Sequence, residues 1–161
     1  MQKNSSKTIL GLHFLVFIWG FTSILGALIT LDSISLVWYR LIIASFLIFF
    51  LFKKKVKLKE LLFCSLGGIL ITTHWILFFH SIKISSVSIA VIMLSTGALL
   101  TSLLEPIFFN RKIYSYEFSI GLVAVAGIYF IFKSESSSIE GILIALVATF
   151  FSALFAILNS Y

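Results

Sequence analysis

Long apolar segments separated by short charged breaks constrain this chain more than any other feature of its sequence. Six such segments follow one another, over residues 8–30, 34–52, 61–82, 87–109, 118–132 and 139–158. A helix of about 20 residues, rising about 1.5 Å per residue, spans the hydrocarbon of a bilayer. The pattern therefore predicts an all-α membrane protein with six transmembrane helices.

The composition agrees with a membrane location. Hydrophobic residues make up 60% of the chain and charged residues 11%, whereas soluble domains carry about 25% charged residues. A net charge of +6 would suggest nucleic acid as a partner in a soluble protein. Here the basic residues flank apolar spans and set topology, so no nucleic-acid partner is predicted. The single Cys64 lies inside a span and is predicted to be a packing residue.

Basic residues are distributed unequally between the two sides of the predicted membrane. With the N-terminus, residues 1–7, in the cytoplasm, nine lysines and arginines lie in cytoplasmic segments and two in outer loops. This positive-inside bias predicts a cytoplasmic N-terminus. The first apolar segment is too long for the core of a signal peptide, so we interpret it as a spanning helix.

The order of the spans indicates an internal repeat. Residues 8–133 hold five spans, residues 134–138 form a polar outer linker, and residues 139–161 resemble the start of a second copy. A shift of 130 residues aligns Gly11 with Gly141 and Phe21 with Phe151. Because five is an odd number, a second copy would enter from the opposite side, as in inverted-repeat secondary transporters. We therefore expect one five-helix half plus a truncated second half, within a protein of roughly twice this length.

Small and polar residues follow one side of the fourth segment. They recur at helical spacing and comprise Ser88, Ser95, Ala98, Ser102 and Glu105, which we call the polar stripe. Such a stripe turns towards other helices or water. Pro106 follows it and predicts a kink, because proline removes the amide that would bond to Ser102.

Two further stripes of small residues indicate close helix contacts. One lies in the first segment and comprises Thr22, Gly26 and Thr30, and the other lies in the sixth and comprises Gly141, Ala145, Thr149 and Ala153. Small residues let helix backbones approach closely in membranes. Helix packing is therefore the predicted role of most of these residues.

Eight residues are candidates for a substrate path. They are Trp19, Arg40, His74, Trp75, Ser95, Thr101, Ser102 and Glu105. Polar and charged groups inside a span are costly and commonly mark a functional site. Each of them also has a structural alternative.

The two charged candidates are predicted at different depths. Arg40 lies about 9 Å from the outer edge and Glu105 about 27 Å from it, so the two are not expected to pair. Arg40 is a candidate to bind an anionic substrate, and the alternative is a side chain that snorkels outwards to Asp32 or Glu140. Glu105 is a candidate to carry a proton or contact a cationic substrate. The alternative for Glu105 is an interfacial salt bridge to Arg111 or a nearby lysine.

The histidines and the central tryptophan have similar alternatives. His74 and His80 are six residues apart, about 120° around the helix, so a shared metal site is not predicted. His74 is a candidate to titrate during transport, and the alternative is a hydrogen-bonded histidine between helices. Trp19 is a candidate to line a cavity, and the alternative is packing or lipid contact. No nucleotide-binding loop, paired carboxylates, metal site or cofactor motif is found, so an enzyme is not expected.

Several segments resemble the EamA-type members of the drug/metabolite transporter superfamily. They include Trp19-Gly20, Arg40, the hairpin FFHSIKISSVSIAVIMLS, the re-entry IYSYEFSIGLVAVAGIYF and the opening GILIALVATFFSALFAILN. The resemblance covers residues 9–133 and the start of a second repeat. It implies ten spans in inverted five-helix repeats, a central cavity and export of small metabolites from the bacterial cytoplasm across the inner membrane.

The predicted function is therefore a secondary transporter that exports amino-acid-like or drug-like small molecules by alternating access. The expected partners are the small-molecule substrate, the lipid bilayer, protons as the coupling ion and a second copy of the chain in a homodimer. Two alternatives stay open. One is a small multidrug-type exporter that works as an oligomer, although its carboxylate in the first span is absent here. The other is a membrane assembly protein whose stripes pack against partners.

Overall fold

The computed structural model describes residues 5–51, 57–112, 114–134 and 139–160. These residues form seven helices, named in chain order as α1 (Ser5–Leu28), α2 (Ser33–Leu51), α3 (Leu58–Ile84), α4 (Val87–Ser95), α5 (Gly97–Phe109), α6 (Ser115–Ser134) and α7 (Ile139–Asn159). The prediction of an all-α membrane protein is confirmed. Most of the predicted linker, residues 135–138, and part of the N-terminal segment, residues 1–4, lie outside the described residues.

Side-chain caps set several helix ends. The Asp32 carboxylate accepts hydrogen bonds from the backbone N–H groups of Ile34 and Ser35, at 3.1 and 3.0 Å, and so begins α2. The Ser86 hydroxyl accepts a bond from the Ile89 N–H at 3.2 Å and begins α4. Such caps satisfy amides that have no partner within the helix.

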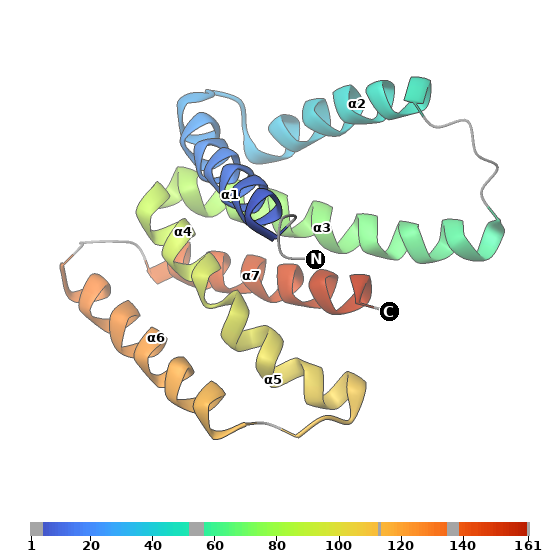
Figure 1. Ribbon diagram of the computed structural model, residues 1–161. Coiled ribbons are helices and arrows are strands. Elements are labelled where there is room, and N and C mark those ends of the chain that lie inside the picture. The colour runs from blue at the N-terminus through green and yellow to red at the C-terminus, as the bar shows by residue number, and fades with distance from the viewer. Residues whose placement is uncertain (1–4, 52–56, 113, 135–138, 161) are drawn as a thin grey trace.

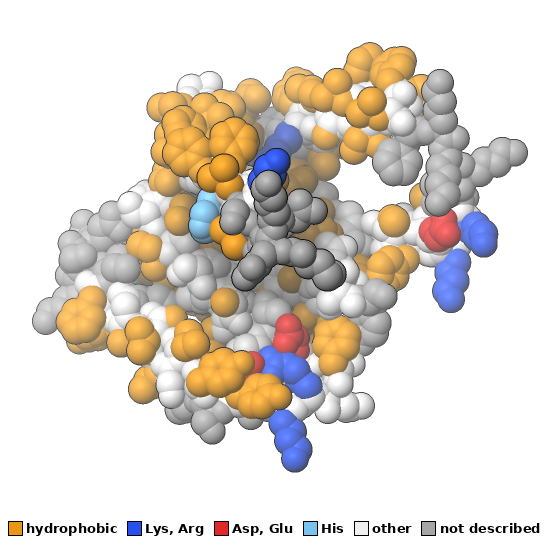
Figure 2. All heavy atoms as spheres, viewed as in Figure 1, with side chains coloured by type: hydrophobic (Ala, Val, Ile, Leu, Met, Phe, Trp, Pro, Cys, Tyr) orange, Lys and Arg blue, Asp and Glu red, His pale blue; other side chains and the backbone are white. Residues whose placement is uncertain are grey.

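Five helical stretches of the described residues are long and apolar enough to cross a membrane. They are Lys7–Leu28, Ser33–Leu51, Leu58–Ile84, Val87–Phe109 and Ile139–Asn159. The 20-residue α6 covers the predicted fifth span. Charged side chains gather at the α5–α6 connection and at the start of α3 (Figure 2). The side chains over α1 and α2 are mainly hydrophobic. Charge at helix ends and apolar surface along them is the pattern of a multi-pass membrane protein.

The fourth span is interrupted at Thr96, which the sequence does not predict, and the kink at Pro106 stays a prediction. Helix α4 ends at Ser95, α5 begins at Gly97, and α5 continues through Pro106. The Thr96 N–H bonds to the Met93 carbonyl at 3.0 Å, three residues back instead of four. The buried Thr96 hydroxyl donates to the same carbonyl at 2.6 Å. These local bonds replace the α-helical bond at that point.

Helix α7 occupies the middle of the described bundle and runs antiparallel to α3 (Figure 1). It also contacts α4 and α5. The predicted small-residue stripe of α7 faces these helices, since Gly141, Ala145, Thr149 and Ala153 are all buried. A Cβ placed on Gly67 of α3 would lie 3.5 Å from side chains of α7. Small residues on both helices therefore permit the close approach, as the spacing predicts.

Helices α1 and α2 pack against the C-terminal part of α3. Leu36 and Val37 of α2 join Phe78, Phe79 and Ile82 of α3 in one buried cluster. At Gly26 the α1 backbone approaches the Phe79 ring so closely that a Cβ would overlap it. The Lys83 ammonium group donates to the Ile29 carbonyl at 2.9 Å, which ties the end of α3 to the chain after α1.

Candidate functional site

The candidate site is built on an arginine of α2 and two rings of α3. The guanidinium carbon of Arg40 lies 4.6 Å from the centre of the Trp75 ring and 5.9 Å from that of Phe79. We call these two rings the Trp75–Phe79 platform. Arg40 and Trp75 are half-buried, and Phe79 is 2% exposed. A cation over an aromatic face is attracted by the electron-rich centre of the ring.

The guanidinium of Arg40 lies nearer to Trp75 than to Phe79 along α3. The start of α2 and the end of α3 lie on the same side of the bundle (Figure 1). Along α3, Trp75 lies four residues, about 6 Å, farther from that end than Phe79 does. The guanidinium is nevertheless closer to Trp75. Outward snorkelling of Arg40, considered from the sequence, stays an alternative prediction.

Neither acidic residue considered as a partner pairs with Arg40. Asp32 instead caps α2, and no described residue forms a hydrogen bond or salt bridge with Arg40. A cation–π contact contributes about 0.5–2 kcal/mol, and insertion of an arginine into a span is costly, up to about 2.5–3.5 kcal/mol at its centre. The platform therefore compensates part of the cost of this charge, and Glu105 is not its counter-ion.

His74 lies beside Trp75 in the sequence but faces α7. Its Nδ1 atom is 2.8 Å from the backbone carbonyl oxygen of Ala148, and the residue is 6% exposed. Because a carbonyl oxygen can only accept, Nδ1 carries the hydrogen and donates it. The arrangement is the interhelical hydrogen bond considered as the structural alternative for His74.

Hydroxyl groups of α4 and α5 bond within their own helices. Ser95 donates to the Ile92 carbonyl at 2.6 Å and Ser102 to the Leu99 carbonyl at 2.9 Å. Ser95 is exposed, whereas Thr101 and Ser102 are half-buried. Among the described residues, these side chains are at least partly exposed at the surface. Their role in a substrate path stays a prediction.

Glu105 takes part in an ion-pair cluster at the α5–α6 connection. The Arg111 Nε donates to Glu105 at 2.7 Å, and the two terminal nitrogens of Arg111 contact the Glu117 carboxylate at 2.9 and 3.1 Å. The Arg111 hydrogen bonds hold the pKa of Glu117 below its ordinary value, and the backbone N–H of Tyr114 adds to the effect. Sequence reasoning anticipated Arg111 as a partner and missed Glu117, which lies in the next helix.

The lowered pKa of Glu117 gives the cluster a defined pH dependence. A carboxylate with a depressed pKa stabilises the folded state above its ordinary pKa, here 4.5, and loses that contribution as the pH falls through the lowered value. We expect thermal unfolding midpoints in detergent to fall on acidification from pH 7 to pH 3. The Glu117→Gln variant should show a smaller fall.

Glu140→Gln is the matched control for this measurement. Glu140 is exposed at the start of α7 and shares no ion pair with a described residue. Its variant should keep the pH dependence of the native protein. Equal acid sensitivity in the native protein and Glu117→Gln would contradict the assignment.

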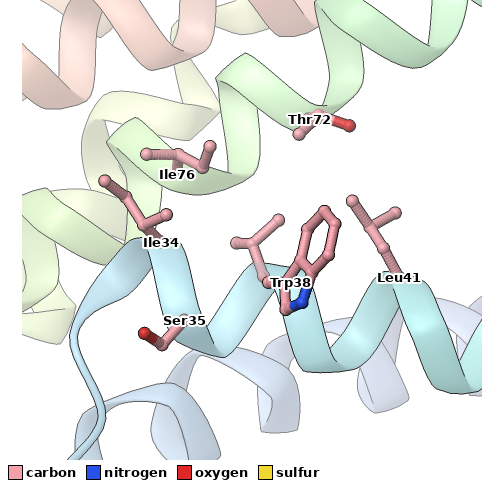
Figure 3. Close-up of a pocket in the computed structure, with 7 residues that line it drawn as sticks. Ile34, Ser35, Trp38, Leu41, Thr72 and Ile76 are labelled. Atoms are coloured by element: carbon pink, nitrogen blue, oxygen red, sulfur yellow. The ribbon is translucent and has the colours of Figure 1, made fainter.

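An apolar cavity of about 170 Å³ lies between α2 and α3 (Figure 3). It is lined by Ile34, Ser35, Val37, Trp38, Leu41, Thr72 and Ile76. Trp38 is 63% exposed, so the cavity opens at the surface of the bundle. None of the eight predicted path residues lines it.

The structure brings together two of the predicted residues, Arg40 and Trp75, and adds Phe79, which sequence reasoning missed. A spacing of four from Trp75 places Phe79 on the same helix face and could have indicated it. Trp19 is 66% exposed on α1, apart from this group. Among the described residues, no group of three His, Cys, Asp or Glu side chains could hold a metal ion.

The apolar helices and the charge held inside one of them define a multi-pass membrane protein. A model of the EamA-like transporter family matches residues 6–133. The chain therefore belongs to the EamA-like transporter family and is a membrane transporter of the drug/metabolite type, with a small molecule as substrate. No curated protein and no solved structure matches the chain.

Proposed function

We propose that this chain forms part of a secondary transporter that exports small metabolites from the cytoplasm by alternating access. Membership of the EamA-like transporter family is the observation that carries the proposal. The excess of basic residues in alternate loops supports a cytoplasmic N-terminus in a bacterial inner membrane. Amino-acid-like and drug-like molecules are the proposed substrates, and protons are the proposed coupling ion.

The packing of the helices supports a path among the first, third, fourth and sixth predicted spans. Helix α1 contacts α3 and α4, and α7 contacts α3, α4 and α5. These helices come from both sides of the proposed repeat boundary, at residues 134–138. Inverted-repeat transporters place their substrate sites at such an interface between repeats.

The polar stripe supplies the surface that this path would use. Ser88, Ser95 and Ala98 are exposed, and Ser102 and Glu105 are half-buried. Hydroxyl groups on an exposed helix face suit either a water-filled cavity or contact with another polar helix. Access of water to this face therefore separates a transporter from a packed assembly protein.

Thiol labelling tests the proposal on the native protein in its own membrane. In a Cys64→Ser background, Ser95→Cys and Ser102→Cys should react with a water-soluble thiol reagent. Leu103→Cys, on a neighbouring exposed apolar position, should resist it as a lipid-facing control. Resistance of both serine positions would favour the assembly protein.

Transport itself is measured in vesicles that contain the native protein. Export of amino-acid-like or drug-like solutes should exceed that of empty vesicles and should fall in Ser95→Leu and Ser102→Leu proteins that still insert. Absence of export for every solute tested would overturn the proposed function.

A further inference from the structure

We propose that Arg40 on the Trp75–Phe79 platform is an anion-recognition point, and that the transported molecule carries an oxyanion, such as a carboxylate, that binds there. This inference rests on the proposed function, because it names the chemical class of the substrate.

The guanidinium of Arg40 has unused hydrogen-bonding capacity. It carries five N–H donors, and none bonds to a described residue. No buried side-chain nitrogen or oxygen among the described residues lacks a partner. The nitrogens of Arg40 are therefore accessible, and they present donors to whatever occupies the space beside α2 and α3.

The platform holds this group in place. The guanidinium carbon of Arg40 lies over the Trp75 ring, and Phe79 is fixed by the close approach of Gly26 and by the Phe78 ring at 5.7 Å. The nitrogens of Arg40 stay accessible beside this ring, and the edge of a planar guanidinium matches two oxygens of a carboxylate or phosphate. Contact with these rings therefore restricts the Arg40 guanidinium more than the guanidinium of a surface arginine is restricted.

The charges around the platform favour an anion. Of the five acidic residues in the described ranges, Asp32 caps α2, Glu60 accepts a bond from the Lys57 N–H, and Glu105 and Glu117 bind Arg111. Glu140 forms no ion pair with Arg40. A charge that is held inside a span without a counter-ion attracts an opposite charge strongly, because water screens it little.

The first experiment measures binding of one labelled probe, alone and with two competing compounds, to the native protein in nanodiscs of neutral phosphatidylcholine. Radiolabelled benzoate joins a carboxylate to an apolar ring, inorganic phosphate is the competitor, and benzamide is the neutral isostere. We expect saturable benzoate binding that phosphate reduces and benzamide does not. Arg40→Gln should weaken binding about tenfold or more, because charge-assisted hydrogen bonds are lost.

Two further variants protect the test against loss of folding. Arg40→Lys keeps the charge but loses the planar fork, so its affinity should lie between those of the native protein and Arg40→Gln. Trp75→Leu keeps Arg40 and removes the stacked ring, and it should also weaken binding. Absence of saturable benzoate binding, or equal affinity in the native protein and all three variants, would overturn the inference.

A second arm distinguishes a transported solute from a lipid headgroup. Phosphatidylglycerol is added to the nanodiscs, and the lipid retained by native and Arg40→Gln proteins is compared by native mass spectrometry. Retention that depends on Arg40, without benzoate binding, would assign the site to lipid phosphate and overturn the solute proposal. Benzoate binding that survives the added lipid supports it.

Failure of this inference and failure of the proposed function give different results. If neutral or cationic solutes are exported, and export is unchanged in Arg40→Gln, the proposed transporter function is supported and the anion-binding inference is rejected. Arg40-dependent benzoate binding without export of any solute would support an anion site at Arg40 and reject the proposed transporter function.

Discussion

A Gly26→Leu protein should unfold several degrees below the native protein. A Cβ at this position would overlap the Phe79 ring. That ring is 2% exposed and packs edge-to-face on Phe78, so it has little space to move away. Overpacking of this kind costs about 1–3 kcal/mol. The thermal midpoint in detergent, followed by circular dichroism at the helical minimum, measures the effect.

Gly20→Leu is the matched control for Gly26. It lies on the same helix, and a Cβ there would meet nothing within 4 Å. Its midpoint should stay close to that of the native protein, because the added side chain meets detergent or lipid. If both variants shift equally, the cause is the loss of glycine in α1 and not its contact with Phe79.

An Ala148→Phe protein should lose the docking of α7 on α3. Ala148 is fully buried, and its carbonyl accepts the hydrogen bond from His74. A phenyl group there would force the helices apart and break that bond, at a cost near the upper end of about 1–3 kcal/mol. Heating in mild detergent followed by size-exclusion chromatography should show earlier loss of the native peak.

Val147→Phe separates this packing effect from the chemistry of phenylalanine. Val147 is the preceding residue on α7 and is 47% exposed. The same large ring is therefore introduced one position away, where space is available. A native elution profile for Val147→Phe with an altered one for Ala148→Phe is the expected result, and equal loss in both would contradict the buried role of Ala148.

The spans and the buried side of α7 could be predicted from the sequence, because both depend on local features of the sequence. Apolar length indicates a membrane helix, and small residues at a spacing of four indicate the face that packs. Gly26 and Ala145 illustrate this, since both lie at close helix contacts. The ends of α2 and α7 lie within one residue of the predicted segments, because the length of an apolar run is also local information.

The site could be predicted in part. The sequence singled out Arg40 and Trp75 separately, but their contact joins residues 35 positions apart on two helices, and single-helix periodicity carries no information on such pairs. Thr96 was missed for a different reason. Its side chain competes for a carbonyl of its own helix, whereas proline is the residue whose covalent chemistry breaks a helix most obviously.

The interruption at Thr96 redistributes the backbone acceptors of the fourth span. In a regular α-helix the Thr96 N–H would donate to the Ile92 carbonyl, four residues back. Here it donates to the Met93 carbonyl, and the Ile92 carbonyl loses that bond. The Ser95 hydroxyl donates to that carbonyl instead. In a bilayer an unmet carbonyl costs several kcal/mol, so Ser95 completes the broken helix whether or not solute passes it. Loss of transport in Ser95→Leu alone would therefore indicate that the hydrogen bond to the Ile92 carbonyl is needed. Loss in Ser102→Leu would indicate that the polar stripe lines the substrate path.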